Sequence, residues 1–182
     1  MSDRPRPASN AAPRAASEPA PADVLLALRR AHPLPLFLAG RPDPPPEGAG
    51  KGPLLSIRGV TARVAHRRHP RQQTIAEIVL HMAYWKDAVT ARLTGRPWKY
   101  DESQNWRAAV ATEQGWAQAR GELGAAHKRL MAALRTLTPE RLVEPVRGPW
   151  RLIDLVADVA THDTYHTAQI FVLRRLKARR ED

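Results

Sequence analysis

The stretch that decides the fold is THDTYHTAQI, residues 161–170, in which two histidines lie four positions apart. Apolar residues recur on both sides of it at spacings of three and four, so we expect a helix from about residue 150 to 177. The buried stripe of that helix runs through His162 and His166. Side chains at i and i+4 project from one helix face and can reach the same ion. The stretch therefore predicts a helix that binds metal.

A second helix is predicted upstream, over residues 74–95. Thr74 and Glu77 form a capping-box pattern at its start, and Gly95 supplies a typical end. Its apolar residues again recur at spacings of three and four, and His81 falls on or beside that stripe. A third imidazole that faces the first two would hold a divalent metal and leave positions open for water or substrate.

The other amphipathic segments predict the remaining helices. Thr138 and Pro139 indicate the start of a short extra helix, and no stretch alternates with period two over strand length, so we expect no sheet. The expected fold class is all-α, a four-helix bundle. Its long helices are predicted over residues 54–68, 74–95, 112–137 and 150–177.

The N-terminal residues differ sharply in composition from this core. Residues 1–22 are rich in Ala, Pro, Ser and Arg, with almost no large apolar side chains, and we expect them to be disordered. A short helix is predicted over residues 23–30, followed by a Pro- and Gly-rich linker. These features divide the chain into a largely disordered Pro/Ala-rich extension, a bundle and a short tail. The predicted bounds are residues 1–50, 51–178 and 179–182.

Composition excludes several classes of function. The chain has no cysteine, so any metal must be held by nitrogen and oxygen ligands. It shows neither a signal peptide nor an apolar run long enough to span a membrane, which favours a cytoplasmic protein. Of the net charge of +11, residues 1–73 contribute +7 (12 Lys and Arg against 5 Asp and Glu). Because the excess lies on the flanks, we expect no specific nucleic-acid binding.

The alternative without a metal is that His81, His162 and His166 are core residues whose ring nitrogens form local hydrogen bonds. Burying three imidazoles in a small bundle costs desolvation, however, and one metal ion would compensate all three. His127 lies beside the inward stripe of its helix and is a weaker candidate for a fourth ligand. Asp163 is expected at the surface or behind the ligands. The remaining histidines, His32, His66 and His69, are interpreted as surface residues.

Two motifs carry a family resemblance. The run TIAEIVLHMAYW, residues 74–85, and the run HDTYHTAQI, residues 162–170, are similar to the two signatures of the DinB superfamily of metal-dependent proteins. The resemblance extends from about residue 52 to 175. It implies a four-helix bundle, usually a homodimer, with His81, His162 and His166 as metal ligands. Ala168 stands where the family often has glycine, and the N-terminal extension has no clear counterpart.

The expected chemistry follows from three imidazoles and an open site. Zn²⁺ or Ni²⁺ would activate water or stabilise the thiolate of a low-molecular-weight thiol. The predicted function is that of a metal-dependent transferase or hydrolase for a small-molecule substrate, with Tyr165 and Gln169 as candidate catalytic residues. For both, an interhelical or subunit contact is the alternative. The aromatic loop of residues 98–106 is a candidate for substrate specificity or, equally, for core packing. A non-catalytic metal-binding or stress-related module remains the alternative function.

Overall fold

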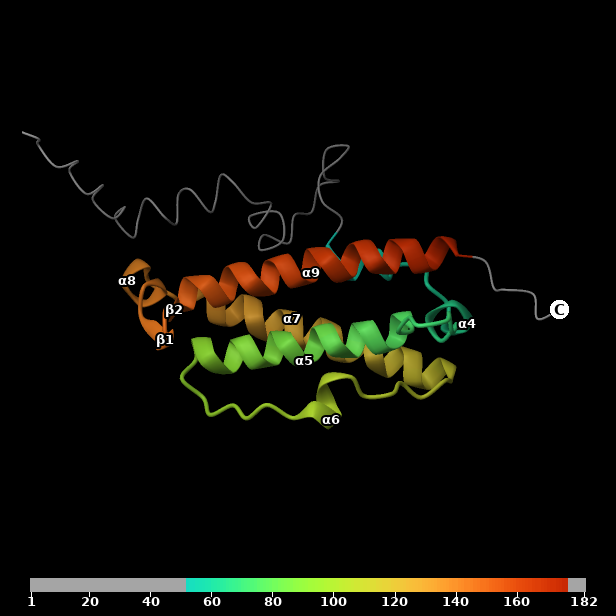
Figure 1. Cartoon of the computed structure of the whole chain (residues 1–182), viewed down its shortest axis with the longest axis horizontal. Helices are drawn as coiled ribbons and strands as arrows, with labels where there is room; N and C mark the ends of the chain where they lie inside the picture. The colour runs from blue at the N-terminus through green and yellow to red at the C-terminus, as the bar shows by residue number, and fades with distance from the viewer. Residues whose placement is uncertain (1–51, 177–182) are drawn as a thin grey trace, which may run out of the picture.

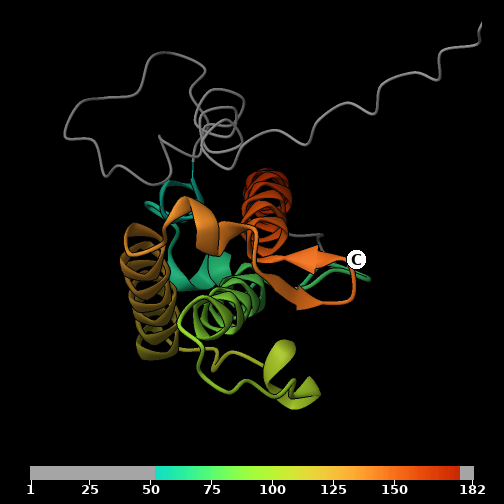
Figure 2. The same ribbon diagram turned by 90° about the vertical axis from the view of Figure 1, so that its left-hand side faces the viewer.

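Three long helices form the body of the protein in the computed structural model, which describes residues 52–176. They are α5 (Ile75–Leu93), α7 (Glu113–Arg135) and α9 (Leu152–Arg175), and they pack side by side (Figures 1 and 2). The predicted all-α class is confirmed. The predicted extension of residues 1–50, its short helix at 23–30 and the tail at 179–182 lie outside the described residues.

The ends of the long helices lie within a few residues of their predicted bounds. At the start of α5 the Thr74 hydroxyl accepts a hydrogen bond from the Glu77 amide (3.2 Å), and the Glu77 carboxylate accepts one from the Thr74 amide (2.8 Å). This is the predicted capping box, and it satisfies two backbone donors that would otherwise lack partners. Gly95 follows the helix with φ +68°, in the left-handed region that favours glycine.

The helices α5 and α7 run parallel, whereas α9 runs antiparallel to both. Two apolar clusters show this, because the first half of α5 packs with the first half of α7 and the end of α9. The second half of α5 packs with the end of α7 and the start of α9. The connection between α5 and α7 must therefore return along the length of α5, and it carries the short helix α6 (Glu102–Asn105) (Figure 1).

The predicted helix over residues 54–68 is wrong as a continuous element. The structure has two single-turn helices there, α3 (Pro53–Ser56) and α4 (Ala62–Ala65). Between them Gly59 adopts φ +71°, which interrupts the helical path. The segment still packs on the bundle: the Trp116 indole of α7 donates a hydrogen bond to the Val60 carbonyl (2.8 Å).

A small hairpin precedes α9, contrary to the expectation of no sheet. Strand β1 (Pro145–Arg147) pairs antiparallel with β2 (Trp150–Arg151), and Gly148 between them has φ +54°. Strands this short contain too few residues to show a period of two in the sequence. The predicted extra helix is α8 (Pro139–Leu142), capped by the Thr138 hydroxyl.

Between the two apolar clusters lies a layer of polar side chains. On α5 the first cluster ends at Ala83 and the second begins at Val89. Comparable gaps occur on α7 and α9. The buried or half-buried ionisable side chains in these gaps are Lys86, His127, His162, Asp163 and His166.

Candidate metal centre

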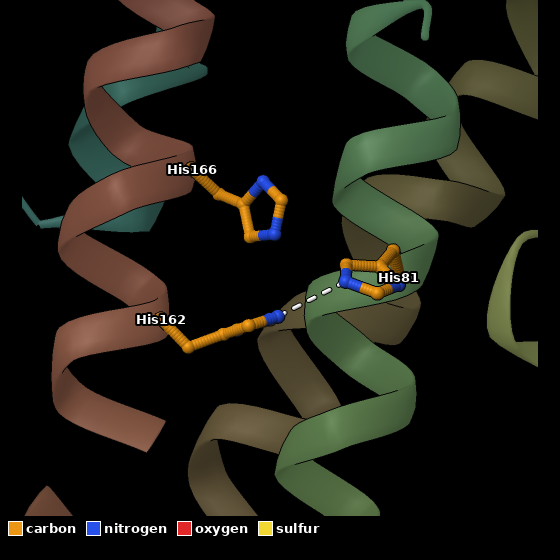
Figure 3. Close-up of side chains that lie close together, drawn as sticks. All are labelled: His81, His162 and His166. Atoms are coloured by element: carbon orange, nitrogen blue, oxygen red, sulfur yellow. Dashed lines mark hydrogen bonds between the residues drawn. The ribbon is translucent and has the colours of Figure 1, made fainter. Parts of the chain in front are cut away.

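The three predicted ligands meet between α5 and α9. His162 and His166 project from α9, one turn apart, toward His81 on α5 (Figure 3). One nitrogen from each ring can be chosen so that all three lie within 4.8 Å of one another. His81 and His166 are buried and His162 is half-buried. The tertiary structure thus brings together the residues that the sequence pattern indicated.

Hydrogen bonds orient two of the rings. The Nδ1 of His81 lies 2.9 Å from the backbone carbonyl oxygen of Asn105, and the Nδ1 of His166 lies 3.0 Å from Oε1 of Gln169. A carbonyl oxygen only accepts, so each Nδ1 carries the proton. In a neutral ring this leaves Nε2 without a proton, the arrangement that a metal-ligating histidine needs.

The third ring completes the arrangement. Nε2 of His162 lies 3.0 Å from Nε2 of His81, and the Nδ1 of His162 is buried without a hydrogen-bond partner among the described residues (Figure 3). Two nitrogens bound tetrahedrally to one Zn²⁺ at about 2.0–2.1 Å would lie roughly 3.4 Å apart. The donor set and its spacing therefore fit a divalent metal.

Burial keeps these rings neutral. Burial is the largest cause that lowers the pKa of His81 and His166. Burial, with smaller contributions from the two neighbouring imidazoles and Lys86, lowers the pKa of His162 to about 3. At neutral pH all three rings then present lone pairs instead of a cluster of positive charges. Neutral imidazole is the form that binds metal.

The match to known families agrees with this geometry. The family model of the DinB superfamily matches residues 55–170, well over half of the chain. The protein belongs to the DinB superfamily. Comparison with curated proteins and with solved structures found no match. None of the helices among residues 52–176 is long and apolar enough to cross a membrane.

The aromatic loop lies directly against the site of this DinB-superfamily protein. The indole of Trp106 stacks on the His81 ring, with centroids 3.6 Å apart and planes 6° from parallel. Trp85 stands edge-on to both His81 (6.4 Å) and His162 (6.2 Å), and Tyr100 lies 6.3 Å from Trp85. The loop therefore covers one side of the histidine group.

The two candidate catalytic residues occupy different surroundings. Tyr165 is 65% exposed, and its ring stands edge-on to His166 at 5.0 Å. Gln169 is half-buried and bonded to the same imidazole. Gln169 is thus placed to orient the His166 ring, whereas Tyr165 borders the site from the solvent side.

The sequence reading missed a buried ion pair beside the histidines. The Lys86 ammonium, wholly buried, bonds Oδ2 of Asp163, which is 3% exposed. Asp163 is therefore buried, not at the surface. Burial raises the pKa of Asp163, and the nearby charge of Lys86 offsets part of that increase. A signal was present: Lys86 lies four residues after Met82 and three before Val89, at an inward position.

The other described histidines do not join the donor group. His127 lies on α7, and burial together with the charge of Lys86 lowers its pKa to about 4. Among the described residues its Nδ1 has no partner, and the group that could hold a metal does not include it. His66 and His69, expected at the surface, are half-buried. His32 lies outside the described residues.

Proposed function

We propose that this protein is a metal-dependent transferase or hydrolase whose metal is held by His81, His162 and His166. The observation that carries the proposal is the convergence of three imidazoles, two of which carry their proton on Nδ1 and so have an unprotonated Nε2. Three protein ligands leave at least one coordination position for water or substrate. Zn²⁺ and Ni²⁺ both suit imidazole ligands.

A bound metal at this site would polarise a substrate oxygen, activate water, or stabilise the thiolate of a low-molecular-weight thiol. The residues of the chain supply orientation and shielding. The Asn105 carbonyl and Gln169 hold the Nδ1 protons of their histidines, and Trp106 keeps water from one face of His81. The Tyr165 hydroxyl, on the solvent side, is our candidate donor to a developing negative charge on a small-molecule substrate.

Metal content tests the site. We expect about one equivalent of Zn²⁺ or Ni²⁺ per chain of untagged full-length protein, measured by inductively coupled plasma mass spectrometry. His81→Ala and His166→Ala should each remove it, because two imidazoles hold such an ion far more weakly than three. His69→Ala, which alters a half-buried histidine outside the group, is the matched control and should keep the metal. A folded wild type that takes up no metal even after reconstitution would refute the proposal.

A second measurement tests whether a low-molecular-weight thiol can reach the metal. The Co²⁺-loaded protein is titrated with a small thiol and followed by absorption spectroscopy. A thiolate that enters an open position produces a sulfur-to-cobalt charge-transfer band in the near ultraviolet. An unchanged spectrum would count against a thiol co-substrate and would leave a hydrolase, or the non-catalytic metal-binding or stress-related module, as the alternatives. The homodimer and the cytoplasmic location implied above stay predictions, and light scattering would measure the former.

A further inference from the structure

The carboxylate nearest in sequence to the proposed ligands, Asp163, forms an ion pair with Lys86 and does not join the histidine group. Asp163 follows His162 directly and precedes His166 by three residues, so all three lie on the inner side of α9. Its charge is close enough to His166 for the two to interact. Carboxylate oxygen is a common metal ligand beside histidine. Yet Asp163 is not in the group of converging donor atoms.

The contacts of Asp163 explain this. Oδ2 accepts from the Lys86 ammonium on the facing helix, and Oδ1 is buried without a hydrogen-bond partner among the described residues. The carboxylate therefore has unused lone pairs on Oδ1, while Oδ2 is held by a strong, charged hydrogen bond. Lys86 itself is wholly buried, and its ammonium has no other side-chain hydrogen-bond partner among residues 52–176. A buried charge that loses its partner is strongly destabilised, so the pair holds the carboxylate firmly.

We infer that Lys86 withholds Asp163 from the metal and so keeps the site at three imidazole ligands with open positions. This inference rests on the proposed metal centre and deepens it. Lys86 and Asp163 are positioning residues: they decide which donors reach the ion without contacting the substrate. A carboxylate ligand would neutralise part of the metal's charge and fill a position that substrate needs, which would weaken its action on water or thiol.

The test is to release the carboxylate and record the coordination of Co²⁺ in the full-length protein. In Lys86→Met the ammonium is gone and the side-chain volume is nearly kept. We expect the visible absorption of bound Co²⁺ to weaken, because five- and six-coordinate Co²⁺ absorb less than four-coordinate Co²⁺. Zn²⁺ affinity, measured against a competing chelator, should rise by roughly tenfold, on the scale of effects from groups around a metal site. The double variant Lys86→Met/Asp163→Asn should return both readouts to wild-type values.

Two further variants keep the result interpretable. Asp163→Asn alone, with Lys86 present, should leave the Co²⁺ spectrum unchanged, and a changed spectrum would overturn the inference even if Lys86→Met failed to fold. Arg129→Met removes a neighbouring ion pair of α5 and should change neither readout. A folded Lys86→Met protein with the wild-type spectrum and Zn²⁺ affinity would also overturn it. Failure of the metal centre itself would be recognised separately, as a wild type that binds no Co²⁺.

Discussion

Two adjacent residues of α5 form ion pairs with opposite helices and in opposite surroundings. Lys86 pairs with Asp163 of α9, and the side chains are 0% and 5% exposed. Asp87 pairs with Arg129 of α7, and the exposed fractions of the side chains are 32% and 48%. The second pair has the better geometry, because the guanidinium bonds both carboxylate oxygens, at 2.9 and 2.8 Å.

Burial, and not geometry, decides what each pair does. Water and salt screen the exposed pair, so its members can be lost at little cost. The buried pair has lost its hydration, and each charge now depends on the other. A side chain that cannot leave its partner has a defined position, which is what a residue beside a metal site requires. Three substitutions test whether burial distinguishes the two pairs.

The largest effect is expected from removing one member of the buried pair. Lys86→Met leaves the Asp163 carboxylate uncompensated, and we expect the metal-free protein to lose about 3–5 kcal/mol of unfolding free energy. Lys86→Met/Asp163→Leu removes both charges, so the loss should be much smaller. Urea denaturation in the presence of a chelator measures both. Equal losses in the single and double variants would show that packing at Lys86, and not its charge, matters.

A smaller effect is expected from His127, which faces the buried ammonium. Its pKa is lowered from 6.5 to about 4, so it stays neutral in the fold where the unfolded chain would bind a proton. The contribution of neutral His127 to the free energy of unfolding is therefore fully present above pH 6.5 and is lost as the pH falls from 6.5 toward 4. In His127→Gln the melting temperature of metal-free protein should fall less steeply over this range, by roughly a few degrees. If the melting temperatures of variant and wild type fell equally with pH, His127 would not be the source of this pH dependence.

The smallest effect is expected from the exposed pair. Arg129→Met should change the unfolding free energy by only about 0 to 1 kcal/mol, because solvent already screens both charges. The small difference should shrink further as salt is added. Urea denaturation at low and high salt measures it. A loss as large as that of Lys86→Met would mean that burial does not distinguish the two pairs.

Local patterns made much of the fold predictable. The capping box of Thr74 and Glu77 depends on residues three apart, and it formed as expected. The spacing of His162 and His166 placed both on one face of α9, and the apolar stripe of α5 placed His81 inside. Such features depend on neighbours in the chain, so periodicity and capping rules reveal them. The break at Gly59 was missed because helix periodicity takes no account of a single left-handed residue.

Local sequence patterns were enough to predict the helical class, the DinB-type motifs and the three converging histidines. The way those histidines are held, and the residues around them, follow from how the helices pack. The carbonyl of Asn105 reaches His81 because α5 and α7 are parallel, which sends their long connection back along α5. Lys86 meets Asp163 across 77 positions of the chain. Contacts of this kind depend on how helices pack, and no local period encodes them.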